Sequence, residues 1–387
     1  MPDFIPYGCQ SISEADIQAV VKVLRSDFIA QGPVVPAFEE AVAIKAEAKH
    51  AIAVSSGTAA LHIACLALGL GVGDRFWTVP NTFVATANAA RHCGAQIDFV
   101  DIDPDTWNLS LPALDAKLVE AEKRGHLPKV VAPVHFAGQP CDLPALRKRA
   151  RQYGFKILED AAHALGATWE NVPIGSGRWS DITIFSFHPV KVITTGEGGM
   201  ALTNDDKLFE TMLLLRSHGV TRDPRLWQGE PAGPWHHEQQ ALGFNYRLTD
   251  LQAALGQSQL QRLDNFITQR STLAARYDNL LAGLPLQLST IQPSASSAWH
   301  LYVIRLLPEA PVDRRVVFEA LRGAGFGVQL HYHPVHLQPF YRQQGFEHGD
   351  YPESERHGQT ALSLPMHPGL AEEQQDQVVV KLREMLA

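Results

Sequence analysis

Short apolar runs alternate with amphipathic segments along the first part of the chain. Segments such as Leu143–Tyr153 and 205–217 place apolar residues at helical spacing, as expected of helices that cover a sheet. The alternation predicts an α/β fold built on a mainly parallel sheet. Runs rich in β-branched residues predict its strands at 51–55, 97–101, 130–135, 156–160, 182–186 and 200–203.

The second part of the chain has a different pattern. The segment 221–243 is rich in Pro, Gly, Trp and His, which predicts a long irregular loop. We expect a large domain at 12–248 and a smaller α/β domain at 249–387, which residues 1–11 join. The elements expected in the smaller domain are a long amphipathic helix from Thr249 to about Leu281, strands at 300–306 and 327–332, and helices at 312–324 and 371–386.

Composition narrows the class of protein. The chain has 387 residues, 45% of them hydrophobic and 19% charged, which is sufficient for a well-filled core. The formal net charge is −8 and the basic residues are scattered, so no nucleic-acid partner is expected. The four cysteines form no CxxC pair, which argues against a zinc site or a disulfide framework. With no pattern of a signal peptide or membrane span, we expect a cytoplasmic protein that acts on a small molecule.

A turn suited to a phosphate follows the first predicted strand. Ser55-Ser56-Gly57-Thr58 leads directly into the apolar helix pattern AALHIACLALG. The first turn of a helix presents free N–H groups and the positive end of the helix dipole, which together attract an anion. The turn matches neither the GxxxxGK[ST] nucleotide loop nor GxGxxG. Taken alone, it is explained more simply as an N-cap.

Two further strand ends carry ionisable residues. The strand at 156–160 ends in Asp160, at the edge where a parallel sheet binds ligands. The strand at 182–186 leads to Lys191, whose small and β-branched neighbours favour an uncharged amine. Taken alone, Lys191 would be assigned to the solvated surface. Together with the phosphate turn, these residues supply what pyridoxal 5'-phosphate (PLP) requires, namely an anchor, a partner for the ring nitrogen and an imine-forming amine. Asp160 would keep that nitrogen protonated, and Lys191 would transfer protons at the substrate Cα.

These motifs also resemble those of a known family. SSGTAALH, LEDAAHALGA and FSFHPVKVITTGEGGM, in this order and spacing, are similar to the DegT/DnrJ-type sugar aminotransferases, and the resemblance spans nearly the whole chain. It implies the fold-type I aminotransferase fold, PLP as the cofactor, and a homodimer whose active sites draw residues from both subunits.

The resemblance also implies roles for individual residues, with Lys191 and Asp160 as the catalytic pair. Many relatives have Trp where this chain has Phe83, and Gln often occurs near the position of His163. The other implied cofactor contacts are Ser56, Gly57, Thr58 and Ser186 at the phosphate, Phe83 against the ring, His163 near the ring hydroxyl, and Asn245 at the phosphate of the neighbouring subunit. The implied substrate contacts are Tyr7, Ser56, Arg247, Gln329, His331 and Tyr332.

Three segments indicate a subgroup of the family. QGPVVPAFEE, WHHEQQALGFNYRLTDLQAALG and GVQLHYHPVHLQPFYR are most similar to enzymes of the pseudaminic acid pathway. Those enzymes aminate C4 of a UDP-linked 4-keto-6-deoxy-N-acetylhexosamine with glutamate as donor, forming UDP-4-amino-4,6-dideoxy-N-acetyl-β-L-altrosamine. A dTDP-linked 3-keto sugar or another 4-keto-6-deoxyhexose is the alternative substrate.

Other interpretations stay open. Dehydratases of the family have His in place of the lysine, so Lys191 disfavours that activity. A non-catalytic regulator on the same fold would have no need for the pair Asp160 and Lys191. His331, His333 and His336 lie close together but lack a carboxylate or thiolate to complete a metal site, so substrate or packing roles are expected. In the loop at 221–243, Trp235, His236 and His237 are either solvated or part of a subunit contact.

Overall fold

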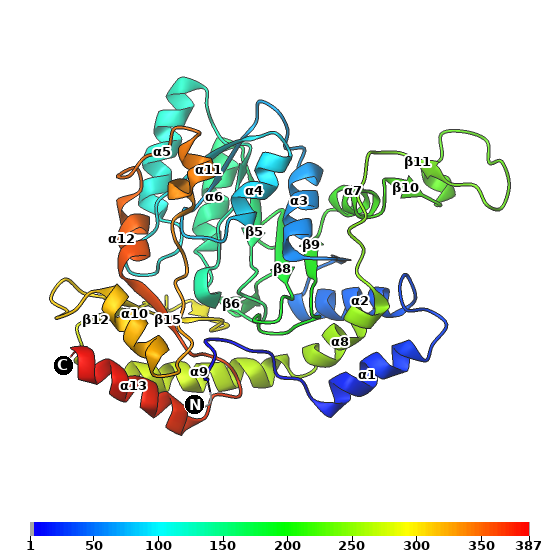
Figure 1. Ribbon diagram of the computed structural model, residues 1–387. Coiled ribbons are helices and arrows are strands. Elements are labelled where there is room, and N and C mark those ends of the chain that lie inside the picture. Colours follow the sequence, from blue (N-terminus) through cyan, green and yellow to red (C-terminus); the bar gives the residue numbers. More distant parts are fainter. Residues whose placement is uncertain (1–3, 387) are drawn as a thin grey trace.

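Seven strands form the central sheet, in the order β1–β9–β8–β5–β4–β2–β3. The computed structural model describes residues 4–386 (Figure 1). Strand β9 runs antiparallel to both of its neighbours, and all other pairs in this sheet are parallel, which confirms the predicted α/β fold. The bounds are His50–Val54 (β1), Arg75–Thr78 (β2), Gln96–Phe99 (β3), Val130–Val131 (β4), Lys156–Asp160 (β5), Ile182–Ser186 (β8) and Gly199–Thr203 (β9).

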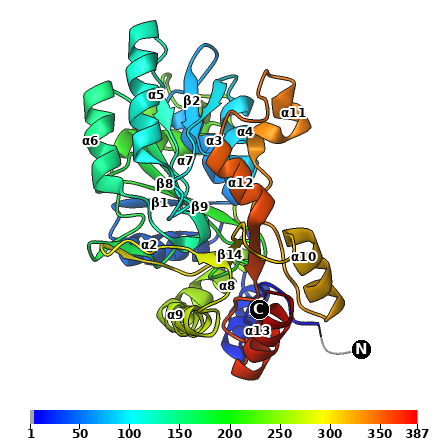
Figure 2. The same ribbon diagram turned by 90° about the vertical axis from the view of Figure 1, so that its left-hand side faces the viewer.

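Helices cover both faces of this sheet because its strands are apolar on both sides (Figure 2). In β1, Ile52 and Val54 pack against one set of helices, while Ala51 and Ala53 pack against the other. The first set is α3 (Gly57–Ala67), α4 (Ala85–His92) and α7 (Asp206–Arg216). The second set comprises α2 (Val34–Ala46), α5 (Leu111–Arg124), α6 (Leu143–Tyr153) and α8 (Asp250–Leu260).

A second core surrounds a three-stranded sheet, β12–β14–β15, formed by Leu286–Leu288, Tyr302–Leu306 and Ala361–Leu364. The helices packed on it are α9 (Leu263–Leu280), α10 (Arg314–Gly323) and α13 (Glu372–Leu386). Ile5 pairs with Phe326, so the N-terminal segment joins this core. Residues 1–3 and 387 of the expected smaller domain lie outside the described residues. The remaining elements include α1 (Glu14–Leu24), α11 (Pro339–Arg342), α12 (Pro352–Thr360), β6 (Thr168–Trp169), β7 (Val172–Pro173) and β13 (Ala295–Ser296).

The segment expected to be an irregular loop at 221–243 is instead a protruding arm (Figure 1). Its two ends pair as β10 (Val220–Thr221) and β11 (Glu238–Gln239), with a 3-10 turn at Pro224–Leu226. The Glu238 carboxylate accepts hydrogen bonds from the backbone N–H groups of Gln228 and Gly229, so the arm satisfies polar groups internally. The segment is therefore irregular over most of its length, as predicted, but the prediction missed these short elements.

Two predictions for the second part of the chain are also corrected. The single helix expected from Thr249 to Leu281 is two helices, α8 and α9, because the chain turns at Arg262, whose guanidinium bonds to the buried Asp16 carboxylate at 2.9 Å. The strand expected at 327–332 does not form. Only Gln329 makes a bridge there, to Ser363, and the segment runs irregularly along the cavity described below.

Within residues 4–386, no helix combines the length and apolar character needed to cross a membrane.

Candidate active site

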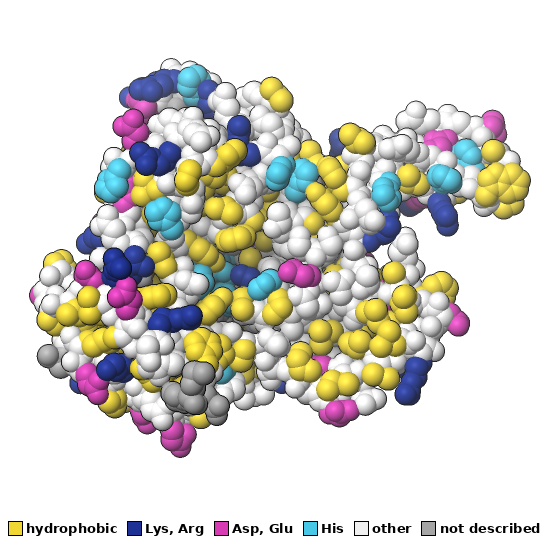
Figure 3. Space-filling model, viewed as in Figure 1, with side chains coloured by type: hydrophobic (Ala, Val, Ile, Leu, Met, Phe, Trp, Pro, Cys, Tyr) yellow, Lys and Arg dark blue, Asp and Glu magenta, His cyan; other side chains and the backbone are white. Residues whose placement is uncertain are grey.

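A cavity of about 770 Å³ lies where β5 and β8 end, at the carboxyl edge of the sheet. Its size is typical of small-molecule sites, and Figure 3 shows this face of the molecule hollowed near its centre, with histidine and basic side chains in the hollow. Among the predicted site residues, those that line the cavity are Tyr7, Ser56, Gly57, Thr58, Phe83, Asp160, His163, Ser186, Lys191, Gln329, His331 and Tyr332.

Two predicted site residues do not line this cavity. Arg247 donates a 3.2 Å hydrogen bond from its guanidinium to the Ser217 hydroxyl. Asn245 is exposed at the base of the arm, where its backbone bridges to Ser217. The chain therefore supplies most of the predicted site by itself, while these two side chains lie outside it.

The turn before α3 is shaped as a cradle. Ser56 caps the helix by accepting a 3.1 Å hydrogen bond from the Ala59 N–H, and the N–H groups of the first turn have no acceptor within the helix. A Cβ at Gly57 would lie 3.0 Å from the Ser186 Cβ, and one at Gly199 would lie 2.4 Å from the Ser56 carbonyl oxygen. Only glycines allow this approach, which places the Ser186 hydroxyl beside free N–H groups. The arrangement fits a phosphate.

Asp160 is buried at the end of β5, and two donors fix its carboxylate. Oδ2 accepts a 2.6 Å hydrogen bond from the Thr86 hydroxyl, and Oδ1 accepts one of 3.2 Å from the Ala162 N–H. The hydroxyl of Thr82 lies 2.9 Å from that of Thr86. Because both threonines are on or just before α4, this helix orients the acid. Neither was predicted, since a threonine in a helical pattern carries no chemical signature.

Lys191 lies in the segment that joins β8 to β9. Burial lowers the pKa of its amine to about 8, and the nearby Asp160 carboxylate opposes part of that shift. A substantial fraction of the amine is therefore neutral near physiological pH, as a nucleophilic lysine requires.

His163 is buried beside the lysine, with 5% of its surface exposed. Burial, followed by the charge of Lys191, holds its pKa well below the usual value, so the ring is neutral. Its Nε2 lies 3.2 Å from the Tyr332 hydroxyl. Its Nδ1 bonds to no atom of residues 4–386, which leaves a buried polar atom available to a ligand.

Other side chains complete the wall of the cavity. Phe83 is 60% exposed, and its ring centroid lies 6.3 Å from that of Tyr332. The ring of His300 lies 4.3 Å from that of His163, and Glu197, in the same segment as Lys191, also lines the cavity. Sequence reasoning missed His300 because only the fold brings it to this edge, and it missed Glu197 although this residue lies in the motif FSFHPVKVITTGEGGM.

The histidines at 331–336 do not come together. His331 contacts the Ser363 hydroxyl at 2.8 Å, His336 contacts the Glu355 carboxylate at 3.0 Å, and His333 is exposed. Across the described part of the chain, no three His, Cys, Asp or Glu side chains are arranged to hold a metal ion.

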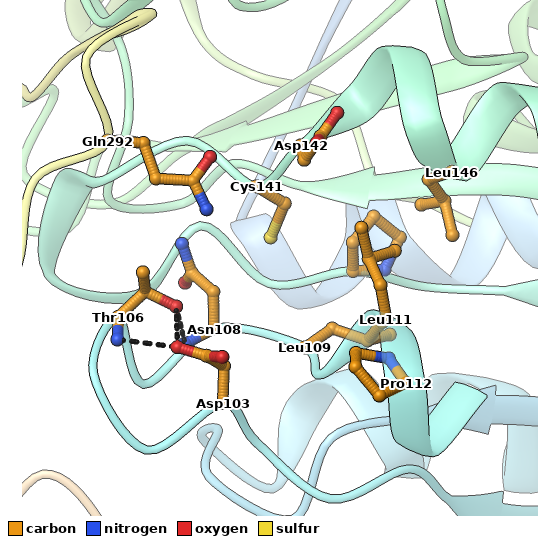
Figure 4. A pocket seen from close by; sticks show the side chains of 11 residues that line it. Asp103, Thr106, Asn108, Leu109, Leu111, Pro112, Cys141, Asp142, Leu146 and Gln292 are labelled. Carbon is orange, nitrogen blue, oxygen red and sulfur yellow. Dashed lines mark hydrogen bonds between the residues drawn. The ribbon is translucent and has the colours of Figure 1, made fainter. Parts of the chain in front are cut away.

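A second cavity, of about 110 Å³, shares no lining residue with the first. Figure 4 shows Asp103 facing Thr106, with which it forms hydrogen bonds of 2.8 Å to the N–H and 2.9 Å to the hydroxyl. Asn108 donates to the Gln139 carbonyl. Since these polar groups have partners within the chain, we assign this cavity no part in the chemistry.

The sheet topology, the phosphate cradle, the strand-end acid and the desolvated lysine define a PLP-dependent enzyme of fold-type I. Residues 10–383 match the DegT/DnrJ/EryC1/StrS aminotransferase family, and the chain belongs to that family. It is therefore a sugar aminotransferase that uses PLP, as the residue chemistry and the resemblance predicted.

Similar proteins span nearly the full length of the chain. Spore coat polysaccharide biosynthesis protein SpsC of Bacillus subtilis (strain 168) is 37% identical over 388 residues, covering 99% of this chain and 97% of SpsC. Helicobacter pylori PseC, an aminotransferase involved in the biosynthesis of pseudoaminic acid, is 29% identical with a TM-score of 0.89 and 99% of each chain covered. The PLP form of Spr1654 from Streptococcus pneumoniae is 28% identical with a TM-score of 0.88, covering 99% of this chain and 100% of that one.

Proposed function

We propose that this enzyme transfers the amino group of glutamate to C4 of a UDP-linked 4-keto-6-deoxy-N-acetylhexosamine in pseudaminic acid biosynthesis. The observation that carries the proposal is the extent of the cavity. It continues from Lys191 and Asp160 to Tyr7, Gln329 and His331, which leaves room for a second ligand beside the cofactor. Similarity to PseC over 99% of both chains supports the choice of sugar.

The cofactor contacts follow from the cradle and the acid. In this proposal the N–H groups of Gly57 and Thr58, with the hydroxyls of Ser56 and Ser186, bind the phosphate. Asp160, held by Thr86, pairs with the protonated ring nitrogen, and Phe83 lies against the ring. When bound, PLP supplies an electron sink for the bonds at the substrate Cα.

Lys191 performs the proton transfers. Its lowered pKa leaves a neutral amine that accepts the proton from the Cα of the donor and later delivers one to the sugar carbon. Burial keeps the amine poorly solvated, which favours return of the proton to the intended carbon.

The sugar nucleotide lies against the segment that contains Gln329 and His331. Burial lowers the pKa of His331 to about 3, so this ring acts as a neutral hydrogen-bonding group. A neutral wall suits the hydroxyl and N-acetyl groups of a sugar. Tyr7 and Tyr332 also line the cavity.

We further propose a homodimer with shared sites. Asn245 and Arg247 lie outside the cavity of their own chain, next to the protruding arm, and in a dimer they reach the phosphate and the substrate of the partner subunit. Within each subunit, residues 12–248 provide the cofactor-binding domain, and residues 249–387 with 1–11 provide the smaller one.

The test is a substrate panel. UDP-linked and dTDP-linked 3-keto and 4-keto sugars are each offered with glutamate, and 2-oxoglutarate formation is followed. The proposal expects turnover of the UDP-linked 4-keto N-acetylhexosamine. Reaction only with dTDP-linked 3-keto sugars would contradict the assigned substrate and favour the alternative.

A further inference from the structure

His163 presents its two ring nitrogens to different surroundings. Nε2 lies 3.2 Å from the Tyr332 hydroxyl, whereas Nδ1 is buried without a partner among residues 4–386. Both residues line the large cavity. Because buried polar atoms are rarely left unbonded, Nδ1 is the atom of His163 that is available to the cofactor.

The neutral imidazole of His163 has one N–H proton, on either Nδ1 or Nε2. Burial and the charge of Lys191 hold the pKa of His163 well below its usual value, so only one nitrogen is an N–H. Two neighbouring imidazoles, those of His300 and His331, are also neutral, because burial lowers the pKa of each. The charged groups that line the cavity are Lys191, Asp160 and Glu197.

The hydrogen bond with Tyr332 determines which ring nitrogen of His163 is protonated. Among residues 4–386, Nε2 of His163 is the one hydrogen-bond partner of the Tyr332 hydroxyl. Burial, with the charge of Asp160, raises the pKa of this phenol, so it stays protonated. If His163 donated from Nε2, the phenol hydrogen would lack an acceptor in the chain. If the phenol donates, both groups are satisfied.

We propose that Tyr332 is a positioning residue that donates to Nε2 of His163 and so keeps the imidazole proton on Nδ1, where it donates to the ring oxygen of PLP. The inference rests on the cofactor placement in the proposed function, and it gives Tyr332 a role beyond the substrate contact expected from the sequence. A donor at the ring oxygen stabilises its negative charge. The nitrogen that joins Lys191 to the cofactor then loses its proton at a lower pH.

The test is a pH titration of the visible absorption of the holoenzyme, without any sugar nucleotide. Tyr332→Phe is expected to raise the midpoint of the spectral change by about one pH unit, because the imidazole proton is then no longer held on Nδ1 as a donor to the charged ring oxygen. The matched control is Tyr341→Phe, which removes a phenol that donates to Asn88 outside this cavity. Its midpoint is expected to equal that of the unmodified enzyme.

A double-mutant cycle tests whether Tyr332 acts on the cofactor through His163 or directly. In a His163→Leu background, Tyr332→Phe is expected to cause no further shift. If this variant does not fold, His163→Gln provides the second background. The proposal is wrong if Tyr332→Phe shifts the midpoint equally with and without His163, or if Tyr332→Phe alone causes no shift. If His163→Leu also leaves the midpoint unchanged, the proposed cofactor placement fails with it. None of these outcomes depends on which sugar is the substrate.

Discussion

The hydroxyl of Thr86 donates a 2.6 Å hydrogen bond to Oδ2 of Asp160, which ties the first turn of α4 to the acid at the end of β5. We expect Thr86→Val to lower kcat about tenfold, because a carboxylate that loses a charge-assisted hydrogen bond is no longer held toward the ring nitrogen. Steady-state kinetics with the accepted sugar measures the effect. Thr86→Ser keeps the hydroxyl and is the control. Equal rates for the Val and Ser variants would show that the hydrogen bond does not contribute.

Cofactor capture by the apoenzyme should depend on the protonation of Lys191. Only the neutral amine attacks the cofactor aldehyde, and burial lowers the pKa of Lys191 to about 8. Below that pH, the rate at which the visible band appears is expected to rise about tenfold per pH unit, and above it to level off. A rate that continues to rise toward the ordinary pKa of lysine would contradict the assigned environment.

Removal of the Lys191 amine should abolish turnover without unfolding the protein. Lys191→Ala is expected to retain its thermal stability and its cofactor phosphate contacts, yet to show no visible band that borohydride bleaches. Turnover and absorption are measured on the same preparation. Lys156→Ala is the control, because its amine is at the surface and pairs with Asp181 instead. Retained transamination in Lys191→Ala would refute the assignment of the lysine.

Arg270 lies in α9, a helix with side chains in both cores. Its buried guanidinium donates to the carbonyl oxygens of Trp299, His300 and Met366 at 3.0 to 3.2 Å. Burial lowers its pKa to about 10, so it stays charged at neutral pH. Arg270→Met leaves these carbonyls without a donor.

We expect Arg270→Met to reduce the free energy of unfolding by about 3 kcal/mol, measured by denaturant or thermal unfolding of the apoenzyme. Arg315→Met is the matched control. It removes an exposed guanidinium that pairs with Glu319 one turn away, so its effect should stay below about 0.5 kcal/mol. Similar losses in both variants would mean that the three carbonyls do not depend on Arg270.

Subunit mixing tests the shared active site. Lys191→Ala and Asn245→Ala are each expected to be poorly active as homodimers. If Asn245 serves the partner's site, a hybrid dimer contains one site with both defects and one with neither. Equal co-expression should then restore about a quarter of the unmodified activity. A mixture no more active than its parents would place Asn245 in its own subunit's site.

The strands that hold the chemistry were predictable because their apolar runs are bounded by charged or small residues. The predictions at 156–160 and 182–186 have the same bounds as β5 and β8, and Asp160 and Lys191 follow from those bounds. The four-residue strands β2 and β15 were not predicted.

Other features depend on contacts between distant segments. The turn between α8 and α9 contains no Gly or Pro that would predict it, and Arg262 at the turn bonds to Asp16, which is distant in the sequence. The alternating pattern at 327–332 is typical of a strand, yet most of this segment faces the cavity instead of a neighbouring strand. The meeting of Thr86 with Asp160, and of Tyr332 with His163, follows from the fold and has no local signature.

The antiparallel direction of β9 determines how the segment that contains Lys191 is held. Because β8 and β9 run in opposite directions, the segment between them leaves and re-enters the sheet at one edge, and Phe187 closes it with hydrogen bonds to Gly198 and Thr195. A parallel connection would instead return through a helix on the face of the sheet. The reactive amine is thus held on a closed loop whose two ends are fixed by adjacent strands, so its position relative to Asp160 at the end of β5 depends on the sheet and not on the arm.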